Sequence, residues 1–156
     1  MKKSKICISN TRGFSLLELL VVLALLGLVS VIVVPSIERG IRDREVRQSA
    51  LALAALAREL RSRAIYDGTL QDLVLNPSEN SIQASAGKRI LLSDEAKISA
   101  IDGGEPMGQG SRRFFFFPNG STVGGEIGIS GREGLAYTVR LQSLSGRVEV
   151  VKGGRR

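Results

Sequence analysis

Histidine is absent from this sequence of 156 residues, and cysteine occurs once, at Cys7. Without histidine the chain has no His-based catalytic triad, no histidine general base and no histidine metal ligand. A single cysteine supports neither a disulfide framework nor a thiolate metal site. We therefore expect no catalytic site, no metal site and no cofactor, and we expect that the protein is not an enzyme.

A strong net charge is also lacking once the positions of the charges are considered. The formal charge is +7, from 22 basic and 15 acidic residues, but four of the basic residues lie within the first 13 positions. The rest of the chain has 18 basic against 15 acidic residues. Mildly basic domains are common, so this balance is weak support for a nucleic-acid partner.

A long apolar run dominates the N-terminal part of the sequence. Residues 14–34 are 21 nearly all apolar positions with one charge, Glu18. An α-helix of this length spans roughly 31 Å, which matches a bilayer core of about 30 Å. A secretory signal would have a shorter apolar region and a small-x-small cleavage site after it, whereas this run ends in Val-Val-Pro-Ser-Ile. The run therefore predicts a transmembrane helix, and the one plausible cleavage point precedes it, between Gly13 and Phe14.

The positions of lysine and arginine do not by themselves orient this helix. Four basic residues precede it, and Arg39, Arg42, Arg44 and Arg47 follow it within the distance that the positive-inside rule counts. Because the two counts are equal, the orientation of the helix has to be inferred from the motif at the start of the apolar run.

That motif is Gly-Phe-Ser-Leu-Leu-Glu, residues 13–18, placed between a basic leader and the apolar run. It resembles the prepilin processing motif of type IV pilins and type II secretion pseudopilins. The resemblance implies that an inner-membrane aspartyl prepilin peptidase cleaves after Gly13 and that the new terminal residue, Phe14, is N-methylated. It also implies a cytoplasmic N-terminus, a single pass through the bacterial inner membrane and a periplasmic C-terminal domain. Glycine suits the cleavage point because no side chain obstructs the approach of the peptidase.

Glu18 is the fifth residue of the mature chain that this cleavage would produce. A carboxylate within hydrocarbon costs several kcal/mol, so we expect it to have a partner. The resemblance supplies one in the amine of Phe14, on the same or a neighbouring subunit, and this pairing would set the axial register during assembly. In the alternative interpretation Glu18, one turn from the start of the helix, extends to the cytoplasmic interface.

Pro35 follows the apolar run, at the mature position where the family often has a proline. We expect Pro35 and Gly40 to interrupt the helix, because proline removes one hydrogen bond and bends the helix. Such a bend would let the helix flex when it packs into a filament. Alternatively, Pro35 marks the end of the membrane span, and both interpretations stay open here.

Residues 36–68 read as an amphipathic continuation of the helix. Leu53, Leu56, Leu60 and Ala64 recur at spacings of three and four, with Ala57 beside them. We expect Arg58, Glu59, Arg61 and Arg63 on the opposite face. Asp67-Gly68 should end the helix, because Gly68 can adopt a left-handed conformation. One face of this helix is therefore expected to pack on a sheet.

Beyond Gly68 the apolar period changes to two, which predicts strands. The predicted strands are residues 73–75, 81–84, 89–92, 96–101, 113–117, 126–129, 136–141 and 147–151. We expect residues 102–110, rich in glycine, to form a mobile loop. Residues 114–117 are four consecutive phenylalanines, which cannot all face one side of a strand, so either a second sheet layer or a neighbouring subunit should receive some of them.

The sequence thus predicts an α+β, type IV pilin-like fold: a long N-terminal helix, transmembrane in its first half, packed on antiparallel β-sheet. The expected divisions are a cleaved leader (residues 1–13), a transmembrane and assembly helix (14–35), its amphipathic continuation (36–68) and a periplasmic β-rich domain (69–156).

Two C-terminal stretches narrow the resemblance. Residues 116–127, with Phe-Pro-Asn-Gly-Ser followed by Gly-Gly, and residues 144–150, with Ser-Gly-Arg-Val, resemble the C-terminal part of the GspH/FimT family. We interpret both as structural turns, since their glycines are free to take positive φ without any ligand.

This resemblance implies a minor pseudopilin of H type in a type II secretion system. Such a subunit would join other minor and major pseudopilins near the tip of a short periplasmic pseudopilus, after contact with the prepilin peptidase and the inner-membrane assembly platform. The pseudopilus would push folded proteins through an outer-membrane pore, so secreted proteins are further candidate partners.

The alternative from the same family is a FimT-like minor type IV pilin that binds DNA during natural transformation. That activity is associated with a basic Gly-Arg-x-Arg element. Here Arg147 is present, but Glu149 stands where the second arginine would help and repels phosphate. The tail residues Arg155 and Arg156 would have to substitute for it, so we favour secretion.

Overall fold

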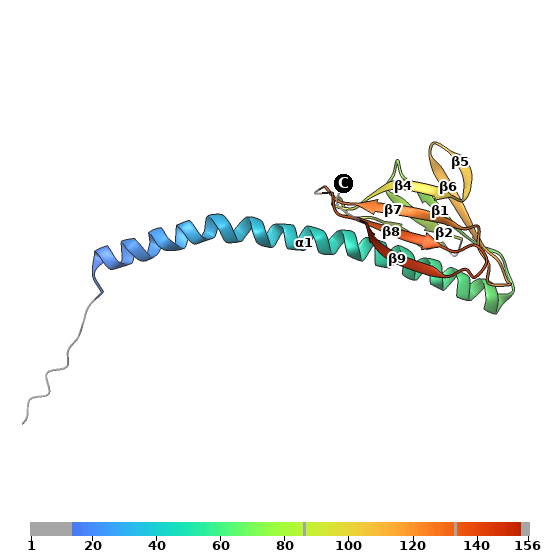
Figure 1. Ribbon diagram of the computed structural model, residues 1–156, viewed down its shortest axis with the longest axis horizontal. Helices are drawn as coiled ribbons and strands as arrows, with labels where there is room; N and C mark the ends of the chain where they lie inside the picture. The colour runs from blue at the N-terminus through green and yellow to red at the C-terminus, as the bar shows by residue number, and fades with distance from the viewer. Residues whose placement is uncertain (1–13, 86, 133, 154–156) are drawn as a thin grey trace, which may run out of the picture. The chain divides into compact units, whose positions relative to one another are not determined.

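The computed structural model describes residues 14–85, 87–132 and 134–153, and within residues 31–42 it describes the backbone only. The described residues form one helix and nine strands (Figure 1). Their bounds are α1 Leu16–Asp67, β1 Gln71–Asn76, β2 Ser81–Ala84, β3 Arg89–Leu91, β4 Lys97–Gly103, β5 Glu105–Gly108, β6 Ser111–Phe116, β7 Gly125–Ser130, β8 Ala136–Leu141 and β9 Val148–Gly153. The chain divides into two compact units after Glu38, and each is described by itself.

The first unit contains the N-terminal half of α1. Among the described residues, no helix is both long enough and apolar enough to cross a membrane. The predicted span, residues 14–34, includes residues 31–34, whose side chains are not among the described ones. The span therefore stays a prediction. The leader, residues 1–13 with Gly13, also lies outside the described residues.

Neither Pro35 nor Gly40 ends the helix. α1 is one helix from Leu16 to Asp67, so the expected interruption at these two residues is wrong. A proline removes one backbone hydrogen bond, and its fixed φ is compatible with a helix, so the bonds on either side of it suffice to continue the helix. The flexibility expected at Pro35 stays a prediction.

The second unit is built around the C-terminal half of α1. One stripe of this helix is fully buried: Val46, Ala50, Leu53, Ala54, Leu56, Ala57, Leu60 and Ala64. The four alanines keep the stripe thin, which allows strands to approach the helix closely. The predicted apolar stripe is therefore confirmed, as is the helix end at Asp67, after which Gly68 takes a φ of +64°.

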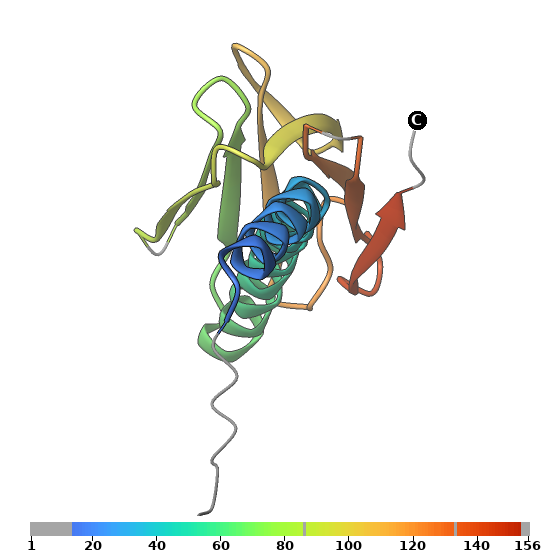
Figure 2. The ribbon, with the colours of Figure 1, turned by 90° about the vertical axis from the view of Figure 1, so that its left-hand side faces the viewer.

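Two antiparallel sheets pack against this stripe. The first has five strands in the order β3-β2-β1-β6-β5, and the second has four in the order β4-β7-β8-β9. Figure 2 shows the strands of the two sheets on two sides of the C-terminal half of α1. Side chains from both sheets share one core with the helix, including Leu73, Ile82, Ile127 and Val139. The predicted α+β fold is confirmed, and it has two sheets.

The four phenylalanines divide between the two faces of β6 and the turn that follows it. Phe114 and Phe116 are fully buried in the core. Phe115 alternates to the outer face, where the guanidinium carbon of Arg113 lies 5.9 Å from its ring centroid. Phe117 is 37% exposed. Burial between the helix and the sheets therefore accounts for the two rings on the inner face of β6, and the second layer expected for the other rings does not cover Phe117.

The expected mobile loop at residues 102–110 is wrong. β4 continues to Gly103, and β5 pairs with β6 through Glu105 opposite Arg113 and Pro106 opposite Arg112. Gly103 and Gly104 both have positive φ, which lets the chain pass from one sheet to the other. β5 is an edge strand whose four residues are all exposed, so no alternation of buried apolar residues indicates it in the sequence. The eight other strands lie within two residues of their predicted ends.

Candidate functional site

The N-terminal half of α1 presents apolar side chains to solvent on every side. All side chains from Phe14 to Ser30 are exposed, and Phe14 itself is 80% exposed. A helix that is apolar all round is stable only within a membrane or among other apolar helices. This segment therefore needs an apolar cover that the first unit does not itself provide.

Glu18 lies in the first turn of α1. A carboxylate at this end of a helix is stabilised by the partial positive charge of the unpaired backbone N–H groups. Its expected pairing with the amine of Phe14 exists only after cleavage at Gly13, so the uncleaved chain does not test it. Pro35 lies within α1, and its side chain is outside the described ones.

The two C-terminal stretches that carry the family resemblance meet at a side chain from the helix. Arg61 Nε donates a hydrogen bond to the carbonyl oxygen of Gly120 at 2.9 Å, and Arg61 Nη2 donates to that of Ser145 at 2.9 Å. The turn at residues 117–121 is closed by the Gly120 N–H, which donates to the carbonyl of Phe117 at 2.9 Å. Both stretches are thus turns fastened to α1, which agrees with their structural interpretation.

Glycine is required at Gly146 because the turns approach each other there. Gly146 has a φ of +60°, and an added Cβ would meet the carbonyl oxygen of Gly120 and the side chain of Arg61. The Gly146 N–H donates to the carbonyl of Gln142 at 2.8 Å, which closes the second turn. The glycine of the Ser-Gly-Arg-Val pattern is therefore explained by the close approach of the backbone at Gly146 to that at Gly120.

Arg58 is exposed, as the sequence pattern predicted, whereas Arg61 is not on the solvent face. Arg58 Nη2 donates to the carbonyl of Val148 in β9 at 2.9 Å, and Arg61 is half-buried between the two turns. Both side chains are long enough to bend from the helix to a neighbouring strand. Two like charges three residues apart on a helix repel each other. This spacing was the one local sign in the sequence that the two guanidinium groups bond to acceptors outside the helix.

These arginines line a cleft of about 420 Å³, which we call the arginine cleft. It is bounded by Arg58, Arg61, Ser62, Gly146, Arg147 and Val148. Arg147, one of the three candidate DNA contacts, is 71% exposed, and its Nε lies 3.0 Å from Glu149 Oε1. The other two candidates, Arg155 and Arg156, lie outside the described residues. Arg147 therefore lines the same cleft as Arg58 and Arg61, two arginines that the sequence did not associate with it.

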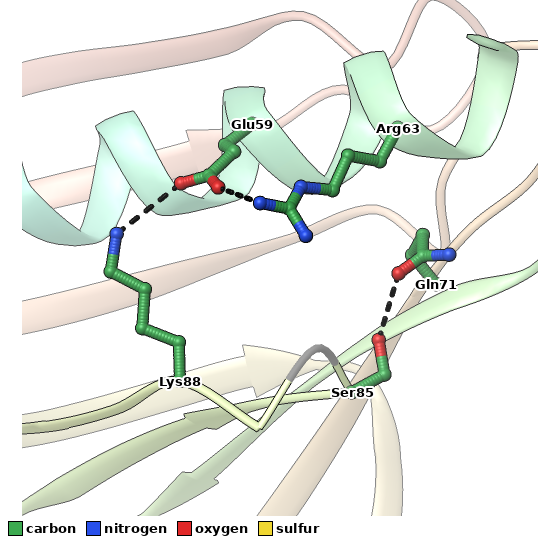
Figure 3. A network of polar contacts seen from close by, with 5 residues as sticks. All are labelled: Glu59, Arg63, Gln71, Ser85 and Lys88. Atoms are coloured by element: carbon green, nitrogen blue, oxygen red, sulfur yellow. Dashed lines mark hydrogen bonds and ion pairs between the residues drawn. The ribbon is translucent and has the colours of Figure 1, made fainter. Parts of the chain in front are cut away.

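A charged network on another part of the helix fastens it to the first sheet (Figure 3). Glu59 accepts from Arg63 at 2.7 Å and from Lys88 at 3.3 Å. The hydrogen bond and charge of Lys88, and then the charge of Arg63, hold the pKa of Glu59 below its usual value. A lowered pKa means that this contribution is present near neutral pH and is lost as acid protonates the carboxylate. Near it, Ser85 Oγ donates to Gln71 Oε1 at 3.1 Å.

Comparison with known proteins bears on both parts of the chain. Residues 8–34 match the model of the prokaryotic N-terminal methylation motif. The chain is 30% identical over 120 residues to type II secretion system protein H of Xanthomonas campestris pv. campestris. That alignment covers 76% of this chain and 71% of the relative.

The fold is similar to that of a solved protein, the minor pseudopilin EpsH from the type II secretion system of Vibrio cholerae. Two solved structures of that protein superpose on this chain with TM-scores of 0.57 and 0.58, each at 14% sequence identity. They cover 69% and 73% of this chain and 97% and 98% of the respective matched chains. At this identity the likeness concerns the fold alone.

Proposed function

Because this chain belongs to the family of type II secretion system protein H, we propose that its mature form is a minor pseudopilin near the tip of the type II secretion pseudopilus. In that position it would help the pseudopilus export folded proteins across the outer membrane. The family membership rests on the 30% identity to the relative in Xanthomonas campestris pv. campestris. The methylation motif at residues 8–34 supports the same function independently.

One observation carries the assembly role: the two units of the chain differ in how their apolar side chains are covered. In the second unit the apolar stripe of α1 is buried by two sheets. In the first unit the described apolar side chains are exposed all round, Leu16 and Leu17 included. Before assembly the lipid bilayer would cover them, and afterwards the corresponding helices of other pseudopilins would do so.

Maturation is the step that we propose connects these two states. Cleavage between Gly13 and Phe14 by the prepilin peptidase would remove the basic leader and create a new amine at Phe14. That amine, after methylation, would pair with the carboxylate of Glu18 on the same or a neighbouring subunit. The pairing offsets the cost of a carboxylate in an apolar environment and sets the axial register.

The proposed location is the inner membrane, with the N-terminus cytoplasmic and residues 69–156 in the periplasm. The assembly platform in the membrane would move the subunit from the bilayer into the pseudopilus. Within it, the two-sheet unit would face the periplasm and meet neighbouring pseudopilins or the exported proteins. The fastening of both C-terminal turns by Arg61 supports this role, because a rigid surface binds partners at a lower entropic cost.

The experiment that tests this proposal compares the wild-type chain with Glu18→Ala in the isolated pseudopilus fraction. We expect the wild-type chain in that fraction, and we expect Glu18→Ala to be cleaved normally but incorporated about tenfold less, as the loss of about 1.4 kcal/mol in register energy implies. Gel mobility measures cleavage, and immunoblotting of the fraction measures incorporation.

Ser15→Ala is the matched control, because it changes a neutral side chain in the same segment and should incorporate normally. If Glu18→Ala incorporates as well as the wild type, Glu18 does not set the register. If the wild-type chain itself is missing from the fraction, the pseudopilin proposal is wrong.

A further inference from the structure

The arginine cleft has a surplus of positive charge. Three guanidinium groups, from Arg58, Arg61 and Arg147, border a volume of about 420 Å³. Among the described residues, Glu149 is the carboxylate that pairs with one of them, at 3.0 Å from Arg147 Nε. Arg58 and Arg61 instead donate to backbone carbonyls, which are neutral. The cleft therefore keeps about two positive charges that its own contacts do not neutralise.

The same groups also keep hydrogen-bond donors in reserve. A guanidinium carries five N–H donors. The contacts within the described part of the chain use one nitrogen of Arg58 and two nitrogens of Arg61. Charge-assisted hydrogen bonds from arginine to a planar oxyanion are the strong kind, and two parallel bonds add geometric selectivity. The chemistry of the cleft is that of a receptor for a carboxylate or a phosphate.

Two of the three arginines are held in place before any ligand arrives. Arg61 is fixed by carbonyls from two different turns, and Arg58 by the first residue of β9. Gly146, which has no side chain, leaves room for Arg61 between the turns. Side chains that are already ordered lose little entropy on binding, so the fixed pair would bind an anion better than mobile surface arginines.

The size and the border of the cleft favour a carboxylate over a nucleic-acid backbone. A single strand is bound by a groove that follows successive phosphates and by aromatic side chains that stack on bases. The residues that line this cleft include no aromatic ring, and Glu149, which pairs with Arg147, would repel a chain of phosphates. A volume of about 420 Å³ is at the small end of the range of ligand-binding pockets.

We propose that the arginine cleft binds an acidic segment of a protein partner, with Arg58, Arg61 and Arg147 receiving its carboxylates. This rests on the proposed function in one respect, that the partner is a protein of the secretion assembly or its cargo. Glu149 occupies one arginine in the free chain, so it competes with the partner's carboxylate. Removal of Glu149 should therefore strengthen binding, whereas removal of Arg147 should weaken it.

The test uses the full chain in a non-ionic detergent and a fluorescent peptide in which glutamate alternates with glycine. Fluorescence anisotropy at an ionic strength of about 0.15 M, where the charges of distant residues are screened, measures the Kd. The same peptide with glutamine in place of glutamate is the neutral probe. We expect Arg147→Gln to raise the Kd about fivefold or more and Glu149→Gln to lower it about threefold. The neutral peptide should not bind measurably.

Arg132→Gln is the matched control, because Arg132 is similarly exposed and pairs with a carboxylate, Glu95, at 3.7 Å. It should change the Kd by less than about twofold, since a distant exposed charge is screened. Thermal melting of each variant shows that it is folded. Cleavage and incorporation into pseudopili do not depend on this peptide, so a failure here is distinct from a failure of the proposed function.

Three results would overturn the proposal. Equal binding of the glutamate and glutamine peptides would show that carboxylates are not recognised. An equal effect of Arg132→Gln and Arg147→Gln on the Kd would show that binding depends on the net charge of the protein and not on the arginine cleft. A single-stranded oligonucleotide that displaces the peptide and itself depends on Arg147 would make the cleft a nucleic-acid site.

Discussion

Gly13→Leu is expected to leave the chain at its precursor size when it is expressed with a prepilin peptidase. The bond to be cut joins Gly13 to Phe14, and a leucine side chain would occupy the space through which the peptidase reaches the backbone. A displacement of about 1 Å at a scissile bond reduces a rate about 100-fold, so cleavage should be nearly abolished. Gel mobility after co-expression measures the cleaved fraction.

The consequences should extend beyond the cut itself. An uncleaved chain keeps the lysines of its leader and has no free amine at Phe14, so Glu18 lacks its proposed partner. Gly27→Leu is the matched control: Gly27 lies in the same apolar segment, and an added Cβ there meets no described atom within 4 Å. It should be cleaved normally. Normal cleavage of Gly13→Leu would show that the site of processing lies elsewhere.

Gly146→Ala is expected to destabilise the two-sheet unit far more than an ordinary glycine replacement. A residue other than glycine in the left-handed region costs about 1–2 kcal/mol. In addition, the new Cβ meets the carbonyl of Gly120 and the side chain of Arg61, so the fastening of both turns to α1 has to shift. We expect a total loss above about 3 kcal/mol in the free energy of unfolding.

Gly68→Ala separates these two contributions. Gly68 has nearly the same φ, +64°, but an added Cβ there meets no described atom within 4 Å. It should cost only the backbone penalty of about 1–2 kcal/mol. Denaturant unfolding of the full chain in a non-ionic detergent measures both variants. Equal losses would mean that the contact between the turns contributes nothing to stability.

The parts of the fold with a local pattern could be predicted from the sequence. The apolar stripe through Leu53 and Leu60 has a helical period, and Gly68 follows it as a stop signal. β8 and most other strands alternate apolar and polar residues, because one face of each packs on the core. β5 has no buried side chain, so nothing in its sequence distinguished it from a loop.

The site depended on contacts between distant positions, which leave little local trace. The bonds of Arg61 to Gly120 and Ser145 and that of Arg58 to Val148 span 59, 84 and 90 residues. From sequence alone, both arginines follow the pattern of a solvent-facing surface. The turns were predicted correctly from Asn-Gly and Ser-Gly, but their meeting at Arg61 follows from the packing of α1 between two sheets.

This arrangement gives a physical reason for the two stretches that resemble the GspH/FimT family. Gly120 and Gly146 lie at the point where two turns and the helix meet, and Arg147 follows directly at the edge of the arginine cleft. The contact between the two turns and the helix thus positions the arginines of the arginine cleft. Changes to Gly146 should act on stability, whereas changes to Arg147 should act on binding.

The most direct test of the central claim is the extracellular protein profile of a strain with an in-frame deletion of this gene. The account predicts that proteins normally exported accumulate in the periplasm and that expression of the intact chain restores their export. Unchanged export in the deletion strain, together with a loss of DNA uptake, would contradict it.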